Sequence, residues 1–466
     1  MIAAMLKAEN FVPFNQTYGT EGVGYGGVIQ TLINRNIPEA RNGFIPAMER
    51  LGIPNNRNSL GGNTIGAMVQ LSNIRYSNWT RSYSPSYLAY GGTNLHVMTE
   101  ATVSKVNFQK QDDGDLVAIG VEVDGQTIDA RKEVVLSAGT LASPTILERS
   151  GIGNTSILSL AGIETLLDLS AVGENLQDHV RIMNTYRLKG DYTSIDLLRN
   201  ATYAAQQQEL YSAGEQSLLE NTGSAYSFFT TAQLASANND TSLVTHLTSL
   251  ALASADPANA IDAHKLTYLT NRTLASQVPE FETIFSDGYT GIQKGYPSST
   301  SSNSSSPHFF TLIGIPQHPL ARGTCHMNTT HPTTPPIINP RYLTNPYDLA
   351  TLTILSKFQR TLALTHPLST YWESEYEPGT QTAQTDSEWR DYARNASFTI
   401  YHPVGSCAML PREKGGVVDT ALRVYGTRNL RVVDASVVPI LPAGHVQTLV
   451  YGVAERGAVK IIEDWG

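Results

Sequence analysis

Two histidines near the C-terminus are the residues of this chain best suited to do chemistry. His402 lies in the run TIYHPVG (residues 399–405), and His445 follows in GHVQT (residues 444–448). An imidazole titrates near neutral pH, so it can take a proton from a hydroxyl group or hold a developing alkoxide by a hydrogen bond. A single histidine before a helix is more often a satisfied structural residue, so the surrounding pattern must decide.

Short elements must hold the two histidines in place. Residues 429–434 (NLRVVD) are rich in β-branched side chains and stop at an aspartate, which predicts a short buried strand. Residues 449–462 carry apolar residues at helical spacing, which predicts a helix directly after His445. A histidine there lies near the positive end of the helix, where it can face an anionic ligand.

A second block of regular structure is predicted between residues 89 and 185. Residues 94–108 predict two short strands, and residues 116–130 predict a hairpin that turns at Asp124 and Gly125. Residues 133–140 form a predicted buried strand, which a turn connects to a helix over residues 141–153. Such a strand–turn–helix unit is typical of α/β proteins.

Both blocks resemble the glucose–methanol–choline (GMC) family of flavin oxidoreductases, above all its glucose oxidase and aryl-alcohol oxidase branch. The resemblance covers nearly the whole chain and rests on YHPVG around His402, GGVVD at 415–419, LRVVD at 430–434, His445, residues 139–153 and AVGENLQDH at 171–179. It implies an FAD-dependent oxidoreductase that acts on the CH–OH group of an alcohol or sugar. Hydride would pass from carbon to flavin N5.

The resemblance also implies roles for individual residues. His402 is expected to be the catalytic base and His445 its hydrogen-bonding partner, whereas His179 is expected to be structural. No metal is expected. The residues expected to bind the cofactor FAD are Val103 at its adenine end, Ser137, Ala138 and Gly139 near the dinucleotide, and Tyr401, Asp434, Ala435 and Val446.

The fold that this resemblance implies is an incomplete α/β FAD-binding domain interleaved with an α+β substrate domain built on an antiparallel sheet. Residues 1–88 form a segment of the substrate domain that covers the flavin, and residues 89–185 form part of the FAD-binding domain. Residues 186–399 form the substrate-binding domain. Residues 400–466 form the C-terminal part of the FAD domain and carry both catalytic histidines.

A glycine-rich run at residues 22–27 (GVGYGG) matches the dinucleotide-binding pattern G-x-G-x-x-G letter for letter. That pattern works only between a hydrophobic strand and a helix, where the pyrophosphate meets the amides of the helix N-terminus. Residues 14–21 are polar instead, and no strand ending in an acidic residue follows about 20 residues later. A glycine-rich loop is therefore predicted. The alternative that the chain is an NAD-dependent dehydrogenase is rejected, because the strand and helix that this motif needs are not predicted around it.

The strand, glycine turn and helix with which the family's own pattern opens are not found in this sequence. We therefore expect a copy of a GMC enzyme with a truncated N-terminus, whose strands at 94–140 and 430–434 have an uncovered edge. Two functions stay open: an active oxidoreductase, or a truncated or pseudoenzyme remnant that does not bind FAD productively. The two retained histidines favour the first, and the missing unit favours the second.

The composition narrows the set of partners. A net charge of −9 argues against nucleic acid and anionic membranes, and no apolar run reaches the roughly 18 residues that span a bilayer. The expected partners are a small-molecule alcohol or sugar and oxygen or another electron acceptor. Two cysteines are too few for a disulfide framework. Cys407 is predicted to be a buried free thiol, and a Cys325–Cys407 bridge stays open.

Asn-x-Ser/Thr sequons, the acceptor motif for N-glycosylation, bear on the localisation of the protein. The sequons favour an extracellular, glycosylated full-length parent. Residues 1–9 are not expected to be a signal peptide, because their apolar stretch is too short and a charged residue interrupts it. Because the chain is rich in Ser and Thr, several sequons would arise by chance. The nine sequon asparagines are Asn15, Asn78, Asn154, Asn200, Asn239, Asn271, Asn303, Asn328 and Asn395.

Overall fold

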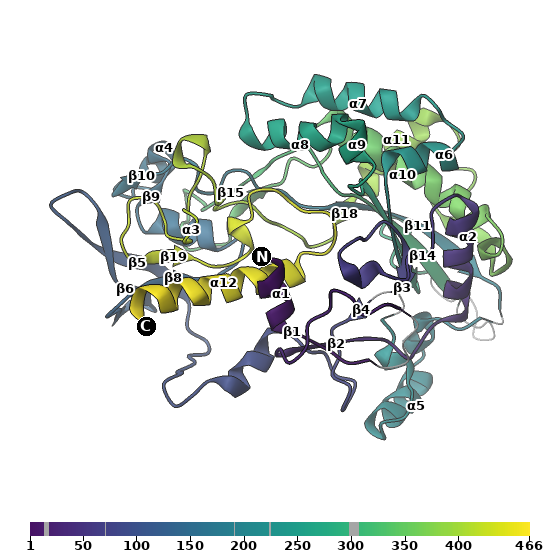
Figure 1. The fold of residues 1–466 in the computed structure, drawn as a ribbon, viewed down its shortest axis with the longest axis horizontal. Coiled ribbons are helices and arrows are strands. Elements are labelled where there is room, and N and C mark those ends of the chain that lie inside the picture. Colours follow the sequence, from purple (N-terminus) through teal and green to yellow (C-terminus); the bar gives the residue numbers. More distant parts are fainter. Residues whose placement is uncertain (14–17, 70, 191, 223–224, 298–306) are drawn as a thin grey trace.

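The computed structural model describes residues 1–13, 18–69, 71–190, 192–222, 225–297 and 307–466. Two packed regions lie at opposite ends of the chain's long axis (Figure 1). One is built on a large antiparallel sheet, and the other contains a short parallel pair of strands. Within the described residues, no helix combines the length and the apolarity needed to cross a membrane.

The larger region is an antiparallel sheet that reads β12-β13-β14-β11-β17 across its width, with β18 paired to one end of β11. Register is continuous between β13 and β14, from Phe281 opposite Pro316 to Asp287 opposite Phe310. Its strands are β11 (Val180–Leu188), β12 (Ala225–Phe229), β13 (Phe281–Asp287), β14 (Phe309–Pro316), β17 (Trp372–Glu377) and β18 (Phe398–Thr399).

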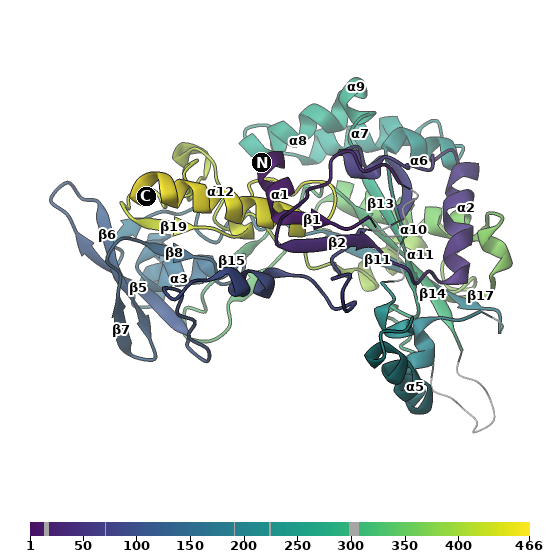
Figure 2. The same cartoon turned by 60° about the horizontal axis from the view of Figure 1, so that its bottom comes forward.

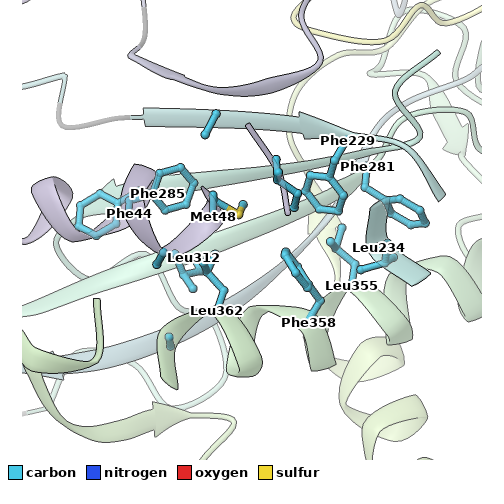
Figure 3. Packing of buried hydrophobic residues seen from close by; sticks show 14 of the residues in the cluster. Phe44, Met48, Phe229, Leu234, Phe281, Phe285, Leu312, Leu355, Phe358 and Leu362 are labelled. Atoms are coloured by element: carbon cyan, nitrogen blue, oxygen red, sulfur yellow. The ribbon is translucent and has the colours of Figure 1, made fainter. Parts of the chain in front are cut away.

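Two helices cover one face of this sheet and form the main hydrophobic core. α10 (Pro346–Leu364) begins with Asn345, whose side chain caps the amide of Tyr347. Figure 3 shows the side chains of α10 and α2 (Phe44–Arg50) packed against aromatic residues of the strands. Large side chains in this core include Phe44, Met48, Tyr186, Phe229, Phe281, Phe285, Phe310 and Phe358.

The smaller region joins a three-stranded meander to a parallel pair. β5 (Val103–Lys110), β6 (Leu116–Val123) and β7 (Gln126–Asp129) form the meander. β8 (Val134–Leu136) lies parallel to β19 (Leu430–Val432), so segments about 300 residues apart share one sheet. α3 (Ser143–Arg149) and α12 (Gln447–Trp465) accompany this pair.

The N-terminal segment packs on the C-terminal helix. α1 (Ile2–Ala8) lies against α12 in both views (Figures 1 and 2), and a Cβ atom on Gly452 would lie 2.9 Å from the sulfur of Met1. β1 (Glu9–Phe11) then pairs in parallel with β2 (Ile29–Ile33), and β4 (Leu71–Ser72) pairs antiparallel with β2.

The glycine-rich run at residues 22–27 connects β1 to β2 and is followed by a strand, not a helix. Gly24 donates its amide to the Glu9 carboxylate at 2.8 Å, and a Cβ atom there would lie 2.0 Å from the carbonyl oxygen of Leu6. The prediction of a glycine-rich loop is confirmed, because no helix N-terminus meets these glycines.

The remaining elements are short and lie mostly around the two sheets. They are β3 (Gly66–Val69), β9 (Ile152–Gly153), α4 (Thr155–Leu160), β10 (Leu167–Asp168), α5 (Ala201–Ser212), α6 (Thr231–Ala237), α7 (Leu243–Ser254), α8 (Ala260–Thr270), α9 (Arg272–Ala275), β15 (Thr324–His326), β16 (Ile337–Asn339) and α11 (Asp386–Asn395).

One of the sequence-based expectations needs correction. Residues 94–108 contain one strand, β5, and not two, because residues 94–99 make no strand pairing and are exposed. A strand is stabilised by its ladder of hydrogen bonds, and these residues lack one. The open question of a Cys325–Cys407 bridge is settled against it, since both are buried free thiols. The expected mixture of α/β structure with an antiparallel sheet is confirmed.

Candidate active site

The structure brings His402 and His445 together. Their ring centroids are 5.0 Å apart, with an angle of 51° between the ring planes. His402 lies in the loop that follows β18, and His445 lies two residues before α12. Neither ring belongs to a regular element, so their loops must be held by contacts from elsewhere in the chain.

Asp178 holds the loop of His402. Its buried carboxylate accepts hydrogen bonds from the main-chain amide of His402 at 2.9 Å, from the hydroxyl of Thr399 at 2.5 Å, and from the hydroxyl of Tyr342. Burial raises the pKa of Asp178, and these hydrogen bonds oppose the rise. Between Thr399 and His402, Tyr401 adopts a left-handed φ of 66°, which folds the loop into a tight turn.

His179 contacts the ring of His402 directly, a contact that sequence reasoning missed. The Nδ1 atoms of the two rings are 3.0 Å apart, and Nε2 of His179 lies 2.9 Å from the main-chain oxygen of Gln317. His179 is fully buried. The motif LQDH was visible in the sequence, but its histidine is 223 residues from His402, and no spacing rule relates the two.

Glu282 on β13 is the second residue that sequence reasoning missed. Its buried carboxylate lies 2.9 Å from Nε2 of His445 and 3.2 Å from the side-chain nitrogen of Gln317. Gln317 also accepts the amide of Gly444 at 2.7 Å, which fixes the loop before α12. The ring of Tyr226 packs on His445 at 4.8 Å between centroids.

These surroundings shift the pKa values of the two histidines in opposite directions. Burial, followed by repulsion from His445, lowers the pKa of His402 from 6.5 to about 3. Burial also acts to lower the pKa of His445, but the Glu282 carboxylate outweighs it and raises that pKa above 6.5. At neutral pH His402 is therefore a neutral imidazole, next to a histidine whose pKa is raised.

His445 opens onto a cavity of about 610 Å³. One third of its side chain (33%) is exposed, although the rest of the ring is enclosed. Thr31 and Trp79 from the N-terminal segment and Tyr226 from β12 line the cavity, together with the first turn of α12. The N-cap residue Val446 makes no side-chain hydrogen bond to that helix start, which leaves the positive end of α12 uncapped at the cavity border.

The residues expected near the dinucleotide form a second cluster. Asp434 accepts hydrogen bonds from the amide of Gly139 at 2.9 Å, from the hydroxyl of Ser143 at 2.5 Å and from the amide of Ser436 at 2.8 Å. This cluster follows the carboxyl ends of the parallel strands β8 and β19, where open α/β sheets place their ligands. The structure thus brings Ser137, Ala138 and Gly139 to Asp434 and Ala435.

The other three predicted residues lie in different surroundings. Val103 is the first residue of β5 and pairs with Val123 of β6. Val446 is buried at the start of α12. Tyr401 is exposed, and its ring lies 5.8 Å from the guanidinium of Arg181.

Comparison with known proteins gives a consistent match. Two family models, both described as GMC oxidoreductase, match residues 27–181 and 319–454. The "GMC oxidoreductase family protein Mala s 12" of Malassezia sympodialis is 34% identical over 433 residues, which are 90% of this chain and 65% of that protein. The chain therefore spans less than two thirds of that relative's length.

Two solved structures share the fold of the whole chain. An FAD-dependent oxidoreductase from Chaetomium thermophilum superposes with a TM-score of 0.83 at 25% identity, covering 99% of this chain and 80% of that one. A fungal aryl-alcohol oxidase superposes with a TM-score of 0.80 at 26% identity, covering 100% of this chain and 79% of that one.

Proposed function

The chain belongs to the GMC oxidoreductase family, and from that premise we propose that it oxidises the CH–OH group of an alcohol or a sugar. FAD is the cofactor of this family. The observation that carries the proposal is the contact of two histidines whose pKa values are shifted in opposite directions, one of which, His445, lines an open cavity. The match to an aryl-alcohol oxidase supports an alcohol as the substrate class.

The residues around His445 fit the flavin end of FAD. The cavity of about 610 Å³ is bordered by the uncapped start of α12, and the positive end of a helix suits the electron-rich edge of a flavin ring. At the other cluster, Gly139 has a φ of 83° and open space where a Cβ atom would be, so a ligand can approach its backbone closely. We therefore assign Gly139, Val446 and the neighbouring residues to FAD binding.

Bound FAD supplies the acceptor for the hydride that leaves the carbinol carbon. His402 is neutral over the whole neutral pH range and takes the hydroxyl proton. A base with so low a pKa cannot ionise an alcohol in advance, so we expect proton transfer to accompany cleavage of the C–H bond. His445, whose pKa is raised by Glu282, donates a hydrogen bond to the substrate oxygen as negative charge develops.

The test follows flavin reduction rather than turnover. The purified chain is mixed with FAD, its visible spectrum is recorded, and a panel of alcohols and sugars is added without oxygen. We expect His402→Gln to keep the bound-flavin spectrum and to slow reduction by roughly 10²–10⁴-fold, the usual contribution of a general base. His331→Gln, at an exposed position, is the control and should behave as wild type. Equal reduction rates in wild type and His402→Gln would remove His402 from the mechanism.

A second candidate function is a remnant that does not bind FAD productively. One observation favours it: Leu95, Val97 and Met98 are 49%, 61% and 64% exposed in a segment without strand pairing, next to β5 of the FAD-binding region. The same spectrum separates the two candidates. A soluble chain that shows no bound flavin at saturating FAD supports the remnant, and a bound-flavin spectrum supports the enzyme.

A further inference from the structure

We infer that His179 is a positioning residue that fixes the tautomer of His402, so that Nε2 of His402 carries the lone pair that accepts the proton. The inference rests on the proposed role of His402 as the base. Because Nδ1 of His402 is engaged by His179 at 3.0 Å, Nε2 is the nitrogen that remains for a substrate hydroxyl. Which nitrogen of a neutral imidazole holds the proton is set by the hydrogen bond that the other nitrogen makes.

The first step is the proton on His179. Its Nε2 lies 2.9 Å from the main-chain carbonyl oxygen of Gln317. A carbonyl oxygen can only accept a hydrogen bond, so Nε2 of His179 must carry a proton and donate it. This assignment depends on the partner atom and not on the placement of any hydrogen.

The second step is the charge of both rings. His179 is fully buried, and burial together with its histidine neighbour holds its pKa well below 6.5. Burial acts in the same direction on His402. Both rings are therefore neutral at pH 7, and a neutral imidazole carries one N–H.

The third step combines the two. With its proton on Nε2, neutral His179 has a bare Nδ1 that can only accept. The Nδ1–Nδ1 contact at 3.0 Å then requires His402 to donate from Nδ1. One proton on Nδ1 leaves Nε2 of His402 unprotonated, which is the form that a general base needs.

The surroundings hold this arrangement firmly. Asp178, the preceding residue, binds the main-chain amide of His402, so two adjacent residues fix both the backbone and the ring of the base. Gln317 holds His179 through its carbonyl oxygen, while its side chain binds Glu282 and the amide of Gly444 beside His445. One residue thus couples the supports of both histidines. Partners of this kind orient an imidazole in metal sites by the same logic.

The test reads the tautomer itself and needs no cofactor. The full chain is labelled with ¹⁵N-histidine, and the ring nitrogens are observed by NMR at pH 7, where protonated and bare nitrogens resonate far apart. The chain has eleven histidines, and the signals of His402 are those that vanish in His402→Gln. We expect a protonated Nδ1 and a bare Nε2 for His402 in the wild type.

A matched pair of variants tests the cause. His179→Asn and His179→Leu introduce side chains of nearly equal size, but only Asn offers an oxygen that can accept from Nδ1 of His402; the carbonyl of Gln317 favours the amide nitrogen on its own side. We expect His402 to keep its tautomer in His179→Asn and to lose it in His179→Leu. A wild-type His402 protonated on Nε2, or an unchanged tautomer in a folded His179→Leu, would overturn the inference. If His179→Leu does not fold, the wild-type and His179→Asn spectra decide.

Kinetics then separate this inference from the proposed function. In flavin-loaded protein, flavin reduction should fall about 10–100-fold in His179→Leu, as for other positioning partners, and stay within about threefold of wild type in His179→Asn. Equal loss in both variants, with the tautomer intact in His179→Asn, would overturn a role through the tautomer. A wild type with the inferred tautomer but no reduction by any alcohol or sugar would instead refute the proposed function.

Discussion

His402 and His445 lie 5.0 Å apart, yet their partners give them different chemistry. His402 meets a buried neutral ring and a main-chain scaffold, whereas His445 meets a carboxylate. Removal of a hydroxyl proton needs a neutral base, such as His402, and a hydrogen-bond donor for the oxygen that becomes negative, such as His445. The roles that we propose for the two histidines therefore depend on the burial of His402 and on the Glu282 carboxylate beside His445, which is 163 residues away in the sequence.

The low pKa of His402 makes a prediction about acid stability. Its pKa is about 3 in the folded chain and 6.5 when unfolded, so the unfolded state binds the proton first as pH falls. The stability that this group contributes is complete above pH 6.5 and is lost as pH falls toward 3. Between pH 8 and pH 5 we expect His402→Gln to lose roughly 2 kcal/mol less unfolding free energy than wild type.

Urea unfolding at the two pH values measures this difference, and comparing changes with pH cancels the cost of the substitution itself. The exposed His331→Gln variant should follow wild type. An identical pH dependence in wild type and His402→Gln would show that His402 titrates normally in the folded chain.

The raised pKa of His445 makes the opposite prediction. A group whose pKa is higher in the folded state stabilises the fold fully below its unfolded pKa of 6.5, and this contribution disappears as pH rises through the folded value. Glu282→Gln removes the carboxylate that raises the pKa. The free energy lost by Glu282→Gln should therefore be larger at pH 6 than at pH 9, measured by urea unfolding. A loss that does not vary with pH would mean that His445 is neutral beside Glu282.

At the scale of elements, the sequence predicted what local rules determine. The hairpin at Asp124 and Gly125 forms as expected, with φ values of 50° and 77°. The helix after residue 141 is α3, which stops before Gly151 with its φ of 82°, and the helix after His445 is α12. These features depend on neighbouring residues, so a single sequence is enough to find them.

Features that depend on distant pairing were not accessible in the same way. Residues 94–99 have the composition of a strand but lack a strand partner among the described residues, so tertiary context overrides the pattern. Glu282 reaches His445 across 163 residues, and its position on β13 gave no local indication of a role. Family resemblance located the two histidines, but only the structure showed what tunes them.

The loop of His402 contains a glycine, Gly405, that packs closely against the main chain of Asn175. Gly405 has a φ of 95°, and a Cβ atom there would lie 2.5 Å from the carbonyl oxygen of Asn175. Gly415 has a similar φ of 85° but open space at the same point. We expect Gly415→Ala to cost about 1–2 kcal/mol from backbone strain alone, and Gly405→Ala to cost more because of the added clash.

Unfolding free energies of the two variants give the comparison, since the backbone term is shared. The NMR signals of His402 should shift in Gly405→Ala and stay in place in Gly415→Ala. Equal costs and unshifted signals in both would show that residues 175 and 405 can separate without disturbing the site.

At the scale of the whole molecule, the site lies where three distant parts of the chain meet. The N-terminal segment lines the cavity with Thr31 and Trp79, the antiparallel sheet supplies Glu282, and the C-terminal loops supply both histidines. α1 packs on α12, whose first turn borders the same cavity. The cavity is therefore formed only when both regions of the fold are in place.

The sequons make a prediction about the outer surface. Asn15 and Asn303 lie outside the described residues, and each of the other seven sequon asparagines is at least partly exposed. Glycans need such exposure, so we propose that the protein is a secreted glycoprotein and expect occupied sites when it passes through a eukaryotic secretory pathway. Peptide mapping before and after enzymatic removal of N-glycans would identify the occupied sites.

The side chains of Asn154, Asn200 and Asn271 cap α4, α5 and α9, so a glycan there must compete with a helix cap. Asn239 and Asn395 are exposed and are not the N-cap residue of a helix, so we expect a glycan to occupy these two sites more fully. A cap contributes about 1 kcal/mol, which is large enough to lower occupancy when glycans are added to a folded chain. Occupancy that is higher at Asn154, Asn200 and Asn271 would indicate that glycans are attached before these helices form. An unglycosylated secreted protein would contradict the prediction altogether.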